Sequence, residues 1–215
     1  MAFKLASLLS VGLLAAQALA HPPSYHHAQT CKIPSKYASS NGTADDSPAI
    51  ASAFAKCANG GTIVFSEGVD YNVFTPISAL NLSHATIEVY GNLHLPQNVT
   101  AVQALFNETT YSSGSTNLYW FSFQGPGIKY VGTPNVTTGW INSYGQAWWD
   151  ANKYPATGLT GRPHLVLFNT TGGSMKYFKS RNPIAWNVQV RGKSTCTCCG
   201  KRVFEILRLT KPLRR

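Results

Sequence analysis

Four groups of residues in the sequence have side chains that bind metals, transfer protons or stack on sugars. They are Cys196 with Cys199, the histidines His21, His26 and His27, the pair Asp45 and Asp46, and the pair Trp148 and Trp149. The cysteine pair has the spacing of half a zinc site or of a redox pair, but no second half and no histidine follow it. A histidine-rich segment near a terminus is usually solvated. The sequence therefore predicts no metal and no cofactor.

The acidic residues are few, and their positions do not favour acid–base catalysis. Asp45 and Asp46 come directly before Pro48 and a run with helical spacing, so we expect them to cap a helix. Asp150 follows the tryptophan pair, where we prefer packing at a turn to a place in a cleft. Beyond Asp150 the remaining acid is Glu205. We assign no catalytic residue.

Trp148 and Trp149 belong to the segment GWINSYGQAWWD, residues 139–150. Two adjacent indoles beside a glycine turn either fill a core or form a platform on which a sugar ring stacks. The residues alone favour core packing but leave both alternatives open. Trp148 and Trp149 are our candidate sugar-stacking residues.

One helix and one disulfide are predicted near the start of the fold. Ile50, Phe54 and Cys57 follow at helical spacing, and a strand is expected at 62–65 after the glycines that end the helix. Cys31 precedes this helix. In an oxidising compartment Cys31 and Cys57 are expected to pair.

From residue 62 onwards the sequence predicts short strands separated by turns. They lie at 62–65, 71–74, 85–95, 118–125, 128–132, 165–169, 174–178 and 185–190. Two segments, TIEVYGNLHLP and FSFQGPGIKYVGT, share a pattern of strand, glycine corner and strand. A recurrence of about 20–35 residues is typical of stacked coils in a parallel β-helix, and an antiparallel sandwich is the alternative. We expect one domain and no helices between these strands.

The leader sequence indicates an exported protein, and the distribution of charge bears on nucleic-acid binding. The net charge of +10 is concentrated in residues 191–215, whereas residues 21–190 carry nine basic and seven acidic side chains. The absence of a basic stripe argues against nucleic-acid binding. Residues 1–20 have the pattern of a signal peptide, and no apolar run is long enough to span a membrane. Six N-x-S/T triplets agree with export and predict glycosylation at Asn41, Asn81, Asn98, Asn107, Asn135 and Asn169.

Several ordered motifs resemble glycoside hydrolase family 28, the pectin-degrading polygalacturonases and rhamnogalacturonases. They are DDSPAI at 45–50, GWINSYGQAWWD at 139–150, GRPHLVLF at 161–168 and KSRNPIAWNVQV at 179–190. The resemblance is greatest to fungal exo-acting members. It implies an all-β fold, a right-handed single-stranded parallel β-helix of the pectin-lyase type with a capping helix. It also implies a pectic polysaccharide, galacturonan or rhamnogalacturonan, as the partner.

The sequence departs from the family where catalysis is expected. Family members invert the anomeric centre, which needs two carboxyl groups about 6.5–9.5 Å apart. Their N-T-D, D-D, G-H-G and R-I-K motifs follow the N-P-x-W segment, and none of these motifs follows that segment in this sequence. We interpret residues 193–215 as an irregular basic tail that arises from a shifted reading frame or a retained intron.

We therefore expect four segments and an extracellular product. They are a signal peptide at 1–20, a flexible leader at 21–30, a partial β-helix at 31–192 and the tail at 193–215. The predicted function is that of a secreted polygalacturonase-type hydrolase which, as it stands, lacks its catalytic aspartates and is inactive. The alternative is a non-catalytic β-helix that binds cell-wall polysaccharide. A monomer is expected in either case.

Overall fold

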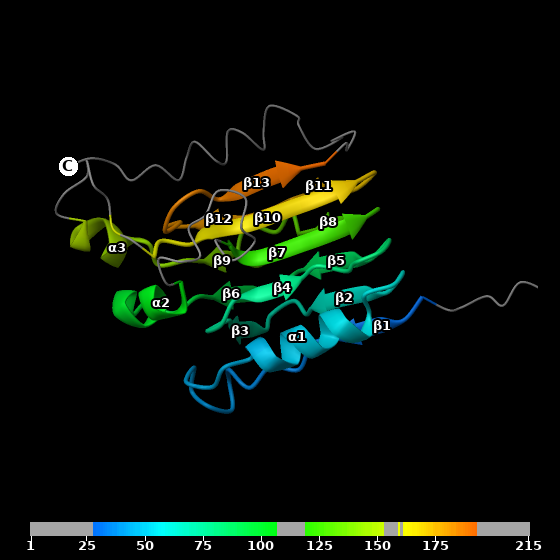
Figure 1. The fold of residues 1–215 in the computed structure, drawn as a ribbon. Coiled ribbons are helices and arrows are strands. Elements are labelled where there is room, and N and C mark those ends of the chain that lie inside the picture. The colour runs from blue at the N-terminus through cyan, green and yellow to red at the C-terminus, as the bar shows by residue number, and fades with distance from the viewer. Residues whose placement is uncertain (1–27, 107–118, 153–158, 160, 193–215) are drawn as a thin grey trace, which may run out of the picture.

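The chain winds through three sheets in a repeated order (Figure 1). The computed structural model describes residues 28–106, 119–152, 159 and 161–192. Sheet 1 contains β1 (Thr30–Lys32), β2 (Thr62–Phe65), β5 (Thr86–Val89), β8 (Lys129–Val131) and β11 (Ser174–Lys176). Sheet 2 contains β3 (Asp70–Asn72), β6 (Asn92–His94), β9 (Ile141–Asn142) and β12 (Ser180–Arg181). Sheet 3 contains β4 (Ile77–Ala79), β7 (Tyr119–Pro126), β10 (His164–Thr171) and β13 (Val188–Arg191).

Each coil visits sheet 1, then sheet 2, then sheet 3, and the next coil stacks on it. All the strand pairings within these sheets are parallel. This arrangement confirms the predicted parallel β-helix, because a sandwich of antiparallel strands would show antiparallel pairs. Among the described residues, no helix is long and apolar enough to cross a membrane.

Coil length varies along the stack. Equivalent positions of successive coils pair in sheet 1, and they are Ile63, Ile87, Tyr130 and Met175. From one of these residues to the next, a coil contains 24, 43 and 45 residues. The first coil has the predicted length. The two longer coils each contain an insertion between sheet 2 and sheet 3, which includes α2 (Val99–Leu105) in one and α3 (Gln146–Ala151) in the other.

These two helices show that the expectation of no helix between the strands is wrong. Asn98 caps α2, since its Oδ1 accepts a hydrogen bond from the amide of Ala101 at 3.0 Å, and α2 buries Val102. The helices have 7 and 6 residues. They are too short for helical periodicity to stand out against the neighbouring strands.

The two similar sequence motifs occupy different corners of the coil. TIEVYGNLHLP carries β5 and β6 and leads from sheet 1 to sheet 2, whereas FSFQGPGIKYVGT carries β7 and β8 and leads from sheet 3 to sheet 1. Ile87 pairs with Tyr130, so β5 aligns with the second strand of the later motif. At that second corner Gly125 has φ 140°, and a Cβ there would overlap the carbonyl oxygen of Leu82.

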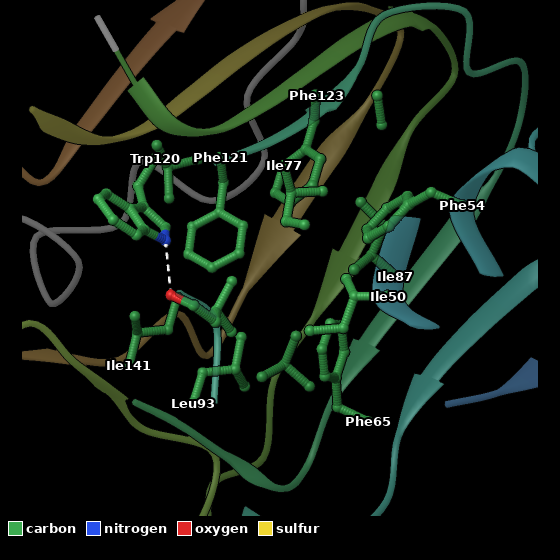
Figure 2. Packing of buried hydrophobic residues seen from close by; sticks show 14 of the residues in the cluster. Ile50, Phe54, Phe65, Ile77, Ile87, Leu93, Trp120, Phe121, Phe123 and Ile141 are labelled. Atoms are coloured by element: carbon green, nitrogen blue, oxygen red, sulfur yellow. Dashed lines mark hydrogen bonds between the residues drawn. The ribbon is translucent and has the colours of Figure 1, made fainter. Parts of the chain in front are cut away.

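Helix α1 (Ser47–Lys56) packs against β1 and β4 (Figure 1). Ile50 and Phe54 are buried on its inner face, as their spacing predicts. Phe54 stacks on Phe123 of sheet 3 with ring centroids 5.3 Å apart, and Figure 2 shows this contact in the core. A disulfide joins Cys57, at the end of α1, to Cys31 in β1, with Cα atoms 6.2 Å apart. In the chain-entropy account, a loop of this size contributes about 3 kcal/mol of stability.

The interior of the coils is filled by apolar side chains from all three sheets. Trp120 and Phe121 of β7 are both fully buried although they are consecutive in the strand. The indole Nε1 of Trp120 donates to the backbone oxygen of Val73 at 3.2 Å, as the dashed line in Figure 2 marks. This bond satisfies the one polar atom that a tryptophan brings into a core.

Asp45 and Asp46 have different hydrogen-bond partners at the start of α1. Asp45 Oδ1 accepts from the amide and the hydroxyl of Ser47, which agrees with the predicted capping. Asp46 has 1% exposure, and its carboxylate makes no capping bond. It accepts instead from the amides of Lys36 and Asn72, at 2.7 and 3.0 Å, and from the hydroxyl of Ser35. Asp46 thus ties the N-terminal segment to sheet 2.

We predict that Asp46→Asn lowers the free energy of unfolding by about 2–3 kcal/mol, because an amide nitrogen replaces a charged acceptor opposite backbone donors. The matched control is Asp150→Asn, which alters an exposed acid on α3 and is expected to change stability by less than about 0.5 kcal/mol. Urea unfolding at constant denaturant slope measures both. Equal midpoints for the two variants would contradict this role of Asp46.

Candidate functional site

An aromatic row lies across sheet 3 at the start of its strands. Tyr119 of β7 and His164 of β10 are partners across the sheet, and their rings meet edge to face with centroids 5.3 Å apart. Trp186, just before β13, stacks on His164 at 5.2 Å and 20°. Its backbone oxygen accepts from the amide of Leu165 at 2.8 Å. Trp186 is 70% exposed, so one face of the row is open to a ligand.

A second exposed indole lies beside the segment that leads from β12 to β13. Trp149 of α3 is 42% exposed, and its Nε1 donates to the backbone oxygen of Pro183. The guanidinium of Arg162 lies 5.2 Å from the centre of the Trp149 ring and donates to the backbone oxygen of Ile184 at 2.6 Å. The loop at 183–186 therefore contacts Trp149 and carries Trp186. We call Tyr119, Trp149, Arg162, His164 and Trp186 the Trp149–Trp186 surface.

Trp148 does not belong to this surface, and the prediction that it stacks on a sugar is wrong. The side chain is 1% exposed and lies in the apolar core. Consecutive residues of a helix point about 100° apart, so the two adjacent indoles of α3 face different environments. Trp148 packs in the core, which is the alternative considered for this pair, whereas Trp149 is exposed.

The charge of this surface comes from arginine rather than from histidine. Burial lowers the pKa of His164, and the positive charge of Arg162 lowers it further. His164 is therefore neutral at neutral pH and acts through its ring face. Arg162 supplies a permanent positive charge beside Trp149. An exposed aromatic face next to a fixed cation is suited to a sugar that carries a carboxylate.

Trp140 lies in a separate cluster on sheet 2. Arg181 lies 4.0 Å and Lys179 5.4 Å from the centre of its ring, and its Nε1 donates to the backbone oxygen of Val136. Lys179 donates to the backbone oxygens of Asn135 and Thr138. Burial, and then the charge of Arg181, lower the pKa of Lys179. These cations already cover the indole, which sets Trp140 apart from Trp186.

The Trp149–Trp186 surface contains no carboxylate. Asp150 is exposed on α3 and accepts from the side-chain amide of Gln146 at 2.7 Å. Asp45 holds the start of α1, Asp46 ties the N-terminal segment to sheet 2, and Asp70 contacts His94 on sheet 2. Within the described part of the chain, no group of three or more histidine, cysteine or acidic residues could hold a metal ion. The arrangement can therefore stack and orient a sugar, but its own residues supply no acid–base pair.

The predicted glycosylation sites differ in accessibility. Asn41, Asn81, Asn98 and Asn135 are exposed, whereas Asn169 lies half-buried within β10 beside Gln124. Glycosylation remains a prediction at each of them. Asn107, the signal peptide, most of the leader including its histidines, and the tail with Cys196 and Cys199 lie outside the described residues.

Comparison with known proteins identifies relatives of this chain. It is 53% identical over 188 residues to the probable exopolygalacturonase C of Aspergillus fumigatus, covering 87% of this chain and 40% of that protein. It is 46% identical over 191 residues to the probable exopolygalacturonase C of Aspergillus niger, covering 89% of this chain and 42% of that protein. The chain is a relative of fungal exopolygalacturonases. It spans about 40% of the length of these relatives.

A solved structure supports the same relationship. The endo-xylogalacturonan hydrolase of Aspergillus tubingensis superposes with a TM-score of 0.55 and 26% identity, over 77% of this chain and 40% of that one. No protein-family model matches the chain. The resemblance to glycoside hydrolase family 28 is confirmed. The stacked parallel sheets and this neighbour fit a right-handed parallel β-helix, as predicted.

Four members of the Trp149–Trp186 surface were not predicted from the sequence as site residues. Arg162 and His164 lie in GRPHLVLF, and Trp186 lies in KSRNPIAWNVQV, two of the motifs that carry the family resemblance. Val166 pairs with Val188 across sheet 3, which places the two motifs on adjacent coils. Aligning the motifs by coil would have brought these residues together.

The lowered pKa of His164 predicts a pH dependence of stability. Below the ordinary pKa of about 6.5, the unfolded chain takes up a proton that folded His164 resists, so this residue's contribution is lost as the pH falls. His164→Phe keeps an aromatic ring in place but does not titrate. We expect the loss of stability between pH 8 and pH 5, measured by urea unfolding, to be smaller in this variant than in wild type. An identical loss in both proteins would refute the assignment.

Proposed function

We propose that this chain provides the pectin-binding coils of an extracellular polygalacturonase-type glycoside hydrolase, and that by itself it binds pectic polysaccharide without cleaving it. The observation that carries the proposal is the exposed Trp186 ring, stacked on His164 and joined through one loop to Trp149 and Arg162. The names of its relatives, exopolygalacturonase and xylogalacturonan hydrolase, support a galacturonan as the ligand.

The chemistry of galacturonate matches this surface. Each sugar unit has an apolar face of C–H groups, which packs on an indole, and a carboxylate, which pairs with a guanidinium. Trp186 and Trp149 offer the indoles, and Arg162 offers the charge between the loop and α3. We assign the Trp149–Trp186 surface to binding and orientation of the polysaccharide. Residues 31–192 act as one β-helical unit in this proposal, with no cofactor.

Cleavage needs groups that this surface does not contain. Inversion requires a carboxylic acid on one side of the glycosidic bond and a carboxylate on the other. Asp45 holds the start of α1, Asp46 and Asp70 contact sheet 2, and Asp150 lies on the exposed side of α3. Glu67 accepts from the side chain of Asn135, and Glu88 lies in β5 of sheet 1. The sequence contains no N-T-D motif, and its Asp-Asp pair, Asp45 and Asp46, lies at the start of α1 rather than after the NPIAW segment. We therefore propose that hydrolysis belongs to the longer relatives and not to this chain alone.

We predict that Trp186→Ala weakens binding of an oligogalacturonate about tenfold or more, since truncating an exposed anchoring tryptophan removes the stacking contact. Isothermal titration calorimetry with the purified full chain measures the dissociation constant. The matched control is Tyr177→Ala, which removes another exposed aromatic ring between β11 and β12. It is expected to leave the affinity unchanged.

Three outcomes would overturn the proposal. Equal losses of affinity in the two variants, or no binding by wild type, would remove the Trp149–Trp186 surface as the binding site. Release of reducing sugar from polygalacturonate by wild type, well above a heat-denatured sample, would show that the chain has an acid–base pair.

A further inference from the structure

A cavity of about 280 Å³ opens beside sheet 2, on a different sheet from the Trp149–Trp186 surface. The residues that matter for its chemistry are Tyr37, Asn72, His94, Asn98 and Tyr144. They come from the segment before α1, from β3, from β6, from the start of α2 and from the turn after β9. The coil stack is what brings them together.

His94 is fixed at the wall of this cavity by both ring nitrogens. Nε2 lies 2.9 Å from Oδ1 of Asp70, and Nδ1 lies 2.7 Å from the hydroxyl of Tyr144. Burial raises the pKa of Tyr144, as do the charges of Tyr37 and Asp70, so its hydroxyl stays protonated. Tyr37 stacks on the His94 ring with centroids 5.3 Å apart, and Tyr144 lies 6.1 Å away at 26°. Three near-parallel rings therefore form one rigid aromatic wall.

Asn72 adds a fixed polar group to the aromatic wall. The residue is 3% exposed, and its amide nitrogen donates to the backbone oxygens of Gly42 and Ala44, each at 2.8 Å. Its orientation is thus set, and its amide oxygen remains as an acceptor. Aromatic faces combined with a few fixed polar groups are the usual lining of a small-ligand site. A cavity of this size and lining suits one sugar ring, with C–H groups on the aromatic wall and a hydroxyl or N-acetyl N–H on the amide.

Asn98 is a predicted glycosylation site at the edge of this cavity. It lines the same cavity and begins the triplet Asn98-Val99-Thr100. Its Oδ1 is engaged by the amide of Ala101, and its Nδ2 makes no hydrogen bond within the described part of the chain. We propose that the cavity holds the first sugar ring of an N-glycan attached to Nδ2 of Asn98.

The attachment is a group transfer that uses a lipid-linked oligosaccharide diphosphate of the secretory pathway as donor. A bond forms between Nδ2 and the first sugar's anomeric carbon, the bond from that carbon to the phosphate oxygen breaks, and the amide loses one proton. The lipid diphosphate is the leaving group. The proposal rests on the export proposed above and not on pectin binding.

Thr100 allows the glycan to be removed without changing the cap of α2. Thr100→Ala destroys the triplet but leaves Asn98 in place, and Thr100→Ser keeps the triplet as the matched control. With the full chain secreted from yeast, we expect the midpoint of thermal unfolding at fixed scan rate to fall by about 2–4 °C in Thr100→Ala. Thr100→Ser is expected to match wild type. In a Tyr37→Ala background the difference between the two Thr100 variants is expected to vanish.

Enzymatic trimming tests which part of the glycan matters. Endoglycosidase H leaves one N-acetylglucosamine on the asparagine, and this form is expected to keep the wild-type midpoint. Ser83→Ala removes the triplet at Asn81. The cavity beside Asn81 is lined mainly by alanine and aliphatic side chains, with Phe54 and Ser78, and does not include Tyr37, so this variant is expected to show no dependence on Tyr37. Mass spectrometry of the Asn98 peptide establishes occupancy.

Three results would overturn the proposal. They are a secreted chain with no glycan on Asn98, an unchanged midpoint in Thr100→Ala, and a Thr100→Ala effect that is the same with and without Tyr37. Saturable binding of free galacturonic acid to Thr100→Ala, lost in Tyr37→Ala, together with an unchanged midpoint, would assign the cavity to a free sugar instead. Failure of pectin binding in Trp186→Ala would leave these results unaffected, so the two proposals are tested separately.

Discussion

The parallel, in-register stacking of strands determines where side chains and insertions can lie in this fold. Each strand pairs with an equivalent strand one coil away, so inward side chains such as Ile63, Ile87, Tyr130 and Met175 form continuous stacks. A strand that lengthened or slipped by one residue would exchange its inner and outer side chains. Extra residues are therefore tolerated at corners. The two longer coils place their helices at one corner, between sheet 2 and sheet 3, and α3 thereby brings Trp149 next to the loop that carries Trp186.

The same stacking gives the two ends of the described coils different chemistry. At the N-terminal end, α1, the disulfide to Cys31 and the buried carboxylate of Asp46 satisfy the backbone and cover apolar surface. Further along, adjacent coils align Tyr119, His164 and Trp186 into a row whose last ring is exposed. The contacts that stabilise the end of the fold thus lie where the chain begins its first coil. The residues proposed to bind polysaccharide lie where sheet 3 meets solvent.

Local signals in the sequence predicted local structure, and the errors lie where several coils combine. Pro48, Ile50 and Phe54 place α1 correctly, and the strand at 62–65 matches β2, because each depends on neighbouring residues. Trp148 and Trp149 could not be separated, since their exposure depends on the face of a short helix that periodicity does not reveal. Strands of two or three residues, such as β9 and β12, take their structure from the coils beside them. Trp186 and His164 meet only through pairing across sheet 3, which sequence spacing alone does not give.

In our proposal, this chain binds pectic polysaccharide at the Trp149–Trp186 surface. The five tryptophans sample distinct environments, since Trp120 and Trp148 are buried, Trp140 is covered by cations, and Trp149 and Trp186 are exposed. The most direct test is to follow the five indole N–H signals by NMR while an oligogalacturonate is added. We predict saturable shifts for Trp186 and Trp149, with the other three signals unchanged. Shifts confined to Trp140, or no shift at any indole, would show that the polysaccharide does not bind at this surface.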